Sequence, residues 1–161
     1  MLLKLIATDA LLKRSRKLFL LAFAAAMVGM AAPAQTRAAD NEAALWQALR
    51  SGGHLALMRH AIAPGTGDPA NFVLGACETQ RNLSDDGRAQ ARRAGDLFRA
   101  NGIDRAALFS SEWCRCQDTA ALMDLGIVTG LPALNSFFQR PENREPQLQA
   151  LRAWLASRTF G

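Results

Sequence analysis

The stretch from residue 54 to residue 60, His54-Leu-Ala-Leu-Met-Arg-His60, decides how the rest of the chain is interpreted. This short apolar run follows Gly52-Gly53 and leads into a segment rich in glycine and proline. Apolar runs of this length between such residues are typical of buried strands. We therefore predict a buried strand that delivers Arg59 and His60 into a loop.

Strands and helices are predicted to alternate along the chain on both sides of this run. Residues 61–83 are predicted to form a long irregular loop, and loops of this length are usually functional or disordered. Ser84 is the predicted N-cap of a helix that ends at Asn101-Gly102. The other predicted elements are a helix over 40–50 capped by Asp40, a strand over 106–110, a helix over 112–125, a strand over 134–138, a polar loop over 141–146 and a helix over 148–155. Such alternation indicates an α/β fold with a parallel sheet.

Arg59 and His60 follow the first predicted strand, and Ser110-Ser111 ends the second, with Arg115 shortly after it. In open α/β sheets, ligands bind beyond the carboxyl ends of the strands. Two guanidinium groups can bind one phosphate, and a neutral imidazole beside them can attack its phosphorus. We interpret the joint pattern as a phosphate site, and His54, at the other end of the strand, as a bystander.

Three blocks of sequence carry a family resemblance: Leu57-Met-Arg-His-Ala61, Gln80-Arg-Asn-Leu-Ser-Asp-Asp-Gly-Arg-Ala-Gln-Ala91 and Ser110-Ser-Glu-Trp-Cys-Arg-Cys-Gln-Asp-Thr-Ala120. In this order they resemble the histidine phosphatase superfamily, over about residues 53–121. Ala61 replaces a more usual glycine, a variant also found among secreted bacterial members. The resemblance implies an α/β fold of the phosphoglycerate-mutase-like type, a three-layer sandwich with a mostly parallel sheet.

The resemblance also implies a function and the residues that carry it. His60 would be the nucleophile that becomes phosphorylated, and Arg59 and Arg115 would bind the phosphate, with Arg81 or Asn82 assisting from the loop. The implied activity is hydrolysis of phosphomonoesters through a phosphohistidine. The implied partner is a small phosphorylated molecule, and neither a cofactor nor a metal is expected.

One departure from the family pattern concerns the C-terminal part. The family carries a second active-site histidine on a later strand, whereas no histidine follows His60 here. We therefore expect an incomplete domain, with a degenerate domain that binds phosphorylated ligands without turnover as the alternative. Glu142 is the candidate proton donor, and a solvated loop carboxylate is the competing interpretation.

The N-terminal third predicts a processing segment. A basic cluster at residues 13–17 precedes fifteen uncharged residues, 18–32, and Ala32-Pro33-Ala34 then offers a cleavage site. These features are typical of a secretory signal peptide, and the apolar run is shorter than a membrane-spanning helix. We expect a signal peptide over 1–34 and a histidine phosphatase-like domain over 35–161, secreted or periplasmic and without membrane contact after cleavage. An uncleaved membrane anchor is the alternative.

The net charge of +5 first suggests an acidic partner such as nucleic acid. Residues 1–34, however, hold five of the basic residues and one acidic residue, which leaves 14 basic and 13 acidic residues in 35–161. A nearly neutral domain has no broad electrostatic surface for nucleic acid, so no nucleic-acid partner is expected.

Three cysteines would enter an oxidising compartment if the chain is exported. A disulfide from Cys77 to either Cys114 or Cys116 is expected, with one thiol left over. Cys114 and Cys116 are poorly placed to bridge each other on a helix. Unpaired packing cysteines remain an alternative, and the spacing argues against zinc.

Overall fold

The structure is a computed structural model that describes residues 32–160. The chain divides into two units, residues 1–47 and 48–161. Helix α2 (Ala32–Arg50) confirms the helix predicted over 40–50 but begins earlier, so Asp40 lies inside it and is not its N-cap. Alanines, which favour helix, extend it toward the N-terminus. Of the predicted signal peptide, residues 1–31 lie outside the described residues.

The second unit alternates helices with short strands. In chain order its elements are η1 (Cys77–Thr79), α3 (Asp85–Ala100), β1 (Leu108–Ser110), α4 (Cys114–Met123), β2 (Val128–Gly130), η2 (Pro132–Leu134), η3 (Pro141–Asn143) and α5 (Arg144–Ala156). Strands β1 and β2 are parallel, with Leu108 opposite Val128. This small parallel sheet agrees with the predicted α/β class. The three-layer sandwich with a larger sheet stays a prediction.

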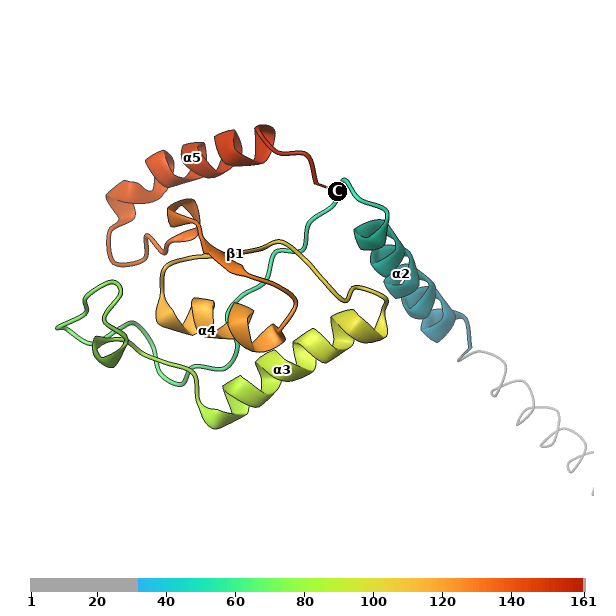
Figure 1. Cartoon of the computed structure of the whole chain (residues 1–161), viewed down its shortest axis with the longest axis horizontal. Helices are drawn as coiled ribbons and strands as arrows, with labels where there is room; N and C mark the ends of the chain where they lie inside the picture. Colours follow the sequence, from blue (N-terminus) through green and yellow to red (C-terminus); the bar gives the residue numbers. More distant parts are fainter. Residues whose placement is uncertain (1–31, 161) are drawn as a thin grey trace, which may run out of the picture. The chain divides into compact units, whose positions relative to one another are not determined.

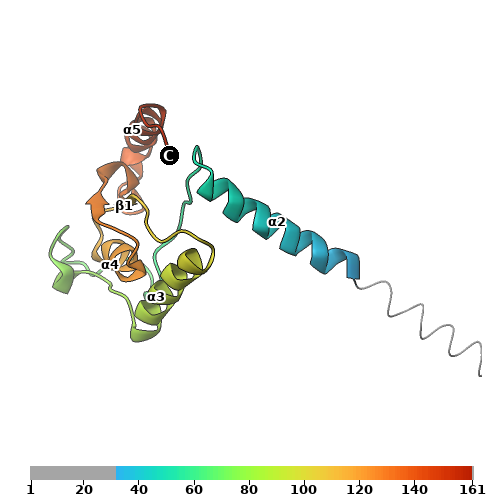
Figure 2. The same cartoon turned by 45° about the vertical axis from the view of Figure 1, so that its right-hand side comes forward.

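Helices lie on both sides of β1. In both ribbon views α5 lies on one side of the strand, and α4 and α3 lie on the other (Figures 1 and 2). Phe109 of β1 meets Trp154 of α5 edge to face, with ring centroids 4.8 Å apart. A Cβ at Gly95 of α3 would lie 2.0 Å from the carbonyl oxygen of Met123, so only glycine lets α3 approach the end of α4 this closely.

Local sequence signals set the ends of α3 as predicted. The Ser84 side chain accepts a hydrogen bond from the backbone N–H of Gly87, at 3.1 Å. Asp85 and Asp86 lie in the first turn, where carboxylates interact favourably with the helix dipole. Asn101 is the C-cap, and the next residue, Gly102, has a φ of +78°. The helix predicted over 148–155 is also confirmed, within α5.

Two strand predictions are wrong. Residues 54–60 form no strand, and Leu55, Leu57 and Met58 are 46%, 78% and 48% exposed. A strand needs a hydrogen-bonded neighbour, and within the described part of the chain β1 pairs only with β2. Residues 134–138 also form no strand, since Leu134 is the last residue of the proline-led turn η2 and residues 135–138 are irregular. The strand that pairs with β1 is β2, which was not predicted from the sequence and which is too short to show an alternating pattern.

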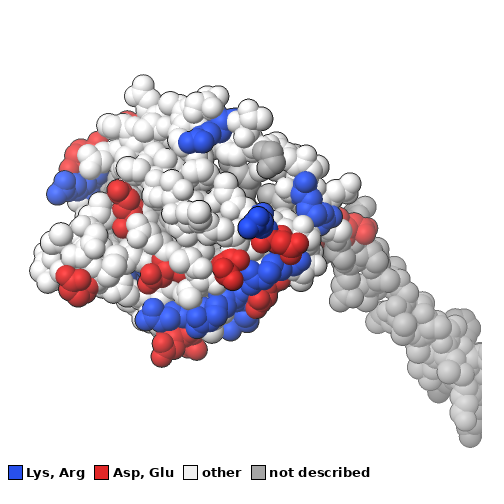
Figure 3. Space-filling model, in the orientation of Figure 1, with Lys and Arg blue, Asp and Glu red and all other residues white. Residues whose placement is uncertain are grey.

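The outer face of α3 carries charges of both signs. Figure 3 shows Lys and Arg side chains next to Asp and Glu side chains along this helix, and Arg88 pairs with Asp85 and Arg99 with Asp96. The face drawn therefore presents no field of a single sign over α3. Across the part of the chain that the structure describes, no helix is long and apolar enough to cross a membrane.

Candidate functional site

The backbone just after His60 is tied to the two helices α3 and α4. The backbone N–H of Ala61 donates to Thr119 Oγ1 of α4 at 3.0 Å, and that of Ile62 donates to Gln90 Oε1 of α3 at 2.9 Å. The carbonyl oxygen of Ile62 accepts from the backbone N–H of Ser84 at 3.1 Å. These three hydrogen bonds fix where His60 lies without any strand.

The His60 ring is oriented by its own backbone. Nδ1 lies 2.7 Å from the carbonyl oxygen of Ala61, and a carbonyl only accepts, so Nδ1 carries the hydrogen. In the neutral ring, the lone pair is therefore on Nε2. Burial lowers the pKa of His60, as do the charges of Arg115, Arg59 and Arg81, and these effects outweigh the hydrogen bond to Ala61, which raises it. The lowered pKa favours the neutral form that a nucleophile needs.

Arg81 is held by the loop that follows His60. Its Nε donates to the carbonyl oxygen of Gly67 at 2.8 Å, and its Nη1 donates to that of Ala63. Gly67 has a φ of +71°, a conformation that favours glycine, which lets this turn form against the guanidinium. Burial lowers the pKa of Arg81, and the nearby Arg115 charge lowers it further.

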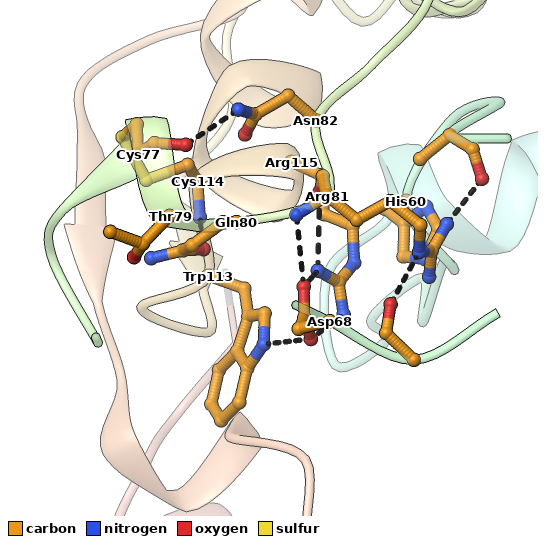
Figure 4. Close-up of polar contacts among 12 residues, drawn as sticks. His60, Asp68, Cys77, Thr79, Gln80, Arg81, Asn82, Trp113, Cys114 and Arg115 are labelled. Carbon is orange, nitrogen blue, oxygen red and sulfur yellow. Dashed lines mark hydrogen bonds and ion pairs between the residues drawn. A yellow bond between two sulfur atoms is a disulfide. The ribbon is translucent and has the colours of Figure 1, made fainter. Parts of the chain in front are cut away.

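Arg115 forms a buried ion pair with Asp68, a residue that the sequence interpretation missed (Figure 4). Arg115 Nη1 lies 2.6 Å from Asp68 Oδ1, Nη2 lies 3.2 Å from Oδ2, and the two side chains are 8% and 5% exposed. Asp68 also accepts from the indole N–H of Trp113 at 3.0 Å and from the backbone N–H of Arg81 at 3.1 Å. The carboxylate therefore has four donors.

These donors decide the charge of Asp68. Burial alone would raise its pKa, but the hydrogen bonds from Arg115, the backbone of Arg81 and Trp113 outweigh burial and hold it below the ordinary value. An ionised carboxylate only accepts hydrogen bonds, so Asp68 positions donors and is not a proton donor. It also neutralises much of the charge of Arg115, which was predicted to bind phosphate directly.

A cavity of about 380 Å³ brings the predicted residues together. Its lining includes His60, Arg59, Arg81 and Arg115. Arg59 is exposed and makes no hydrogen bond or ion pair within residues 32–160, so its guanidinium is free to bind an anion. His54 is exposed and does not line this cavity.

Two predicted site residues lie elsewhere. Asn82 does not line the cavity, and its Nδ2 donates to the carbonyl oxygen of Cys77 at 2.6 Å. Its buried Oδ1 has no hydrogen-bond partner among the described residues. Glu142 lies in η3, is exposed, and also does not line the cavity. The structure therefore brings neither side chain to the cavity.

A disulfide joins Cys77 to Cys114, with the two Cα atoms 5.6 Å apart, and Cys116 has a free thiol. Beside the bridge, the Gln80 side chain accepts a hydrogen bond from the backbone N–H of Cys114 at 3.0 Å. Both contacts attach the loop that carries Arg81 to the start of α4, which carries Arg115. The disulfide thus links the backbone segments that carry two arginines of the cavity.

Comparison with known proteins agrees with this geometry. Residues 55–133 match the sequence model of the histidine phosphatase superfamily, branch 1. Over 81 residues the chain is 36% identical to 2,3-bisphosphoglycerate-dependent phosphoglycerate mutase 1 of Nitrosomonas europaea, which covers 49% of this chain and 34% of that protein. The chain thus spans about a third of the length of this relative. No solved structure matches the chain significantly.

Proposed function

We propose that this chain, whose residues 55–133 match the sequence model of the histidine phosphatase superfamily, transfers a phosphoryl group from a small phosphomonoester to His60 and then to water. The observation that carries this proposal is the orientation of His60. Its Nδ1 hydrogen points to the Ala61 carbonyl, which leaves the Nε2 lone pair for phosphorus. The cavity places three guanidinium groups around the same imidazole.

The reaction has two steps. Nε2 forms a bond to phosphorus while the ester P–O bond breaks, and the leaving oxygen takes the electron pair. Water then attacks phosphorus, the P–Nε2 bond breaks, and phosphate leaves. Over both steps the oxygen of the water ends in phosphate, and one of its protons ends on the alcohol.

The arginines supply the electrostatic part of catalysis. Within residues 32–160, the Arg59 guanidinium and Arg81 Nη2 form no hydrogen bond, while Arg81 Nε and Nη1 bind the loop. Both can donate to the phosphoryl oxygens as negative charge develops on them. Arg115 also lines the cavity, but its two Nη atoms bind Asp68, so it donates less to the phosphoryl group than Arg59 and Arg81 do.

The ion pair between Arg115 and Asp68 favours a second candidate function, which is binding of phosphorylated ligands without turnover. Asp68 engages both Nη atoms of Arg115, so this guanidinium offers the substrate less than a free one would. A site of this kind would bind phosphate through Arg59 and Arg81 and form no bond to His60.

Turnover of a generic phosphomonoester separates these candidates. We expect His60→Ala to lower kcat/KM by at least about 10³, the loss typical when a catalytic nucleophile is removed. His54→Ala is the matched control, since His54 is exposed and outside the cavity, and it should keep full activity. Equal turnover by wild type and His60→Ala would remove His60 from the mechanism. Phosphate affinity without any turnover would favour the binding function.

We also propose that the chain is exported and acts in an oxidising compartment. The disulfide between Cys77 and Cys114 supports this, because such bonds persist outside the reducing cytosol. The intact mass of the protein recovered from an expressing cell tests the cleavage. A mature chain starting at residue 35 is expected, and a full-length chain in the membrane fraction would contradict it.

A further inference from the structure

The residues that line the cavity are of two chemical kinds. His60 and the guanidinium groups of Arg59 and Arg81 suit a phosphoryl group. Leu134, Ser136, Phe138 and Gln139 come from one short segment and carry no charge. A phosphomonoester likewise combines an anionic group with a leaving group, and this lining offers contacts to both.

The segment 134–139 is held in place by hydrogen bonds of Asn135. Asn135 Oδ1 accepts from the backbone N–H of Glu112 at 2.8 Å, and Asn135 Nδ2 donates to Glu112 Oε2 at 2.7 Å. The carbonyl oxygen of Asn135 accepts from Gln147 Nε2 of α5 at 2.8 Å. Segment 134–139 is therefore fixed to Glu112, and the residue before it, Ser111, lines the cavity.

The Phe138 side chain is largely exposed, so contacts with the rest of the chain do not explain a large apolar residue at this position. Its side chain lines the cavity although the residue is 74% exposed, so the ring makes little contact with the rest of the chain. The backbone N–H of Phe138 donates to Ser136 Oγ at 3.2 Å, which shapes the turn that presents the ring. An exposed phenyl ring gains free energy when an apolar or aromatic partner covers it.

Trp113 adds a fixed aromatic side chain to the same cavity. It is 9% exposed, its indole N–H donates to Asp68, and its ring stacks on Phe72 with the centroids 5.2 Å apart. These contacts fix the indole before any ligand arrives. A planar ring attached to the phosphate can therefore meet an ordered apolar surface.

We propose that Leu134, Ser136, Phe138 and Gln139 form a leaving-group subsite that selects aryl phosphates, with the aryl ring stacked on Phe138. This rests on the proposed function and names its substrate class. The two polar members of the subsite, Ser136 and Gln139, suit a ring that carries hydroxyl or amide substituents. Small alkyl phosphates of the same charge bind Arg59 and Arg81 in the same way, but their alkyl group does not cover the ring of Phe138.

Binding of phosphonates tests the subsite without turnover, because their C–P bond is not transferred. The probes are inorganic phosphate, methylphosphonate, cyclohexylphosphonate and phenylphosphonate, titrated calorimetrically into the whole chain. We expect phenylphosphonate to bind about three- to tenfold more tightly than methylphosphonate, the range that stacking of aromatic rings supports. Phe138→Ala should abolish this preference and leave the affinity for phosphate unchanged. Ile127→Ala is the matched control, since Ile127 is 89% exposed and outside this cavity.

Each other outcome overturns the proposal. If phosphate binds but phenylphosphonate binds no more tightly, or if Phe138→Ala keeps the preference, the subsite is wrong and the proposed function stands. Equal binding of cyclohexylphosphonate and phenylphosphonate would contradict selection of aryl groups. If neither phosphate nor any phosphonate binds, both the subsite and the proposed function are wrong.

Discussion

Residues 55–58 and residues 61–82 are close neighbours in the chain, but they are held very differently. In the first segment, three large apolar side chains are exposed, and its backbone forms no hydrogen bond to the rest of the described chain. In the second, the backbone of Ala61 and Ile62 is bound by α3 and α4, and Arg81 is bound by the loop and by Asp68. The site is therefore positioned by helices, a loop and a disulfide, and not by the strand predicted to precede His60.

The ion pair between Asp68 and Arg115 is the strongest link in the well-held segment. We expect Asp68→Asn to lower the free energy of unfolding by about 3–5 kcal/mol, because it leaves the buried Arg115 charge unpaired. Asp96→Asn, which breaks an exposed pair with Arg99, should cost less than about 1 kcal/mol. Urea unfolding measures both, and equal losses would show that the buried pair does not hold the site.

Asp68→Asn should also change how the free energy of unfolding depends on pH in acid. The pKa of Asp68 in the folded protein lies below its ordinary value of 3.8. The stabilisation by this pair is therefore complete above the ordinary value and is lost as the pH falls through the folded-state pKa. Wild type should lose this part of its stability below about pH 4, whereas Asp68→Asn should not.

The disulfide comes next in expected effect. It closes a loop over a sequence separation of 37, and removing it with the double substitution Cys77→Ser and Cys114→Ser should cost about 2–4 kcal/mol. Phosphate affinity should fall as well, because the loop with Arg81 is then released from the start of α4. Cys116→Ser is the control and should leave stability nearly unchanged. Unchanged phosphate affinity in the double variant would show that the disulfide does not set the spacing of the arginines.

Arg59 should shift the titration of His60 by a smaller amount. The Arg59 charge helps to lower the pKa of His60 below 6.5, so Arg59→Ala should raise that pKa. Because attack needs the neutral imidazole, the acidic limb of the rate profile should move to higher pH. NMR titration of His60, with His54 as internal reference, measures the shift. A pKa of His60 above 6.5 in wild type would contradict the electrostatics.

The poorly held segment should give the smallest effect. Leu57 is 78% exposed, so Leu57→Ser should change the free energy of unfolding by no more than about 0.5 kcal/mol. Leu125, which is 2% exposed, is the reference, and Leu125→Ala should cost about 2–5 kcal/mol. A large loss in Leu57→Ser would show that residues 55–58 are buried against a partner after all.

The success of each prediction from sequence depends on the distance over which its signal acts. The ends of α3 were predictable because Ser84 and Gly102 cap it locally. Arg59, His60 and Arg115 line one cavity, although the strand predicted to bring the first two there is absent. Asp68 was missed because its partner lies 47 residues along the chain and no local pattern marks it.

The wrong strand at residues 54–60 has a different cause. An apolar run shows that a segment can be buried, but it does not show that a neighbouring strand is present to pair with it. Residues 134–138, also predicted to form a strand, are instead held as a loop by the hydrogen bonds between the Asn135 side chain and Glu112. In both cases the missing information was the neighbour and not the residue type.

The position of the phosphoryl group on His60 tests the central claim most directly. The protein is incubated with a phosphomonoester, quenched in alkali, and examined by 31P and 15N NMR after labelling of the imidazole nitrogens. Phosphorus bonded to Nε2 of His60, and absent from His60→Ala, is the predicted result. Phosphorus on Nδ1, on His54 or on no histidine while the ester is still hydrolysed would contradict the account.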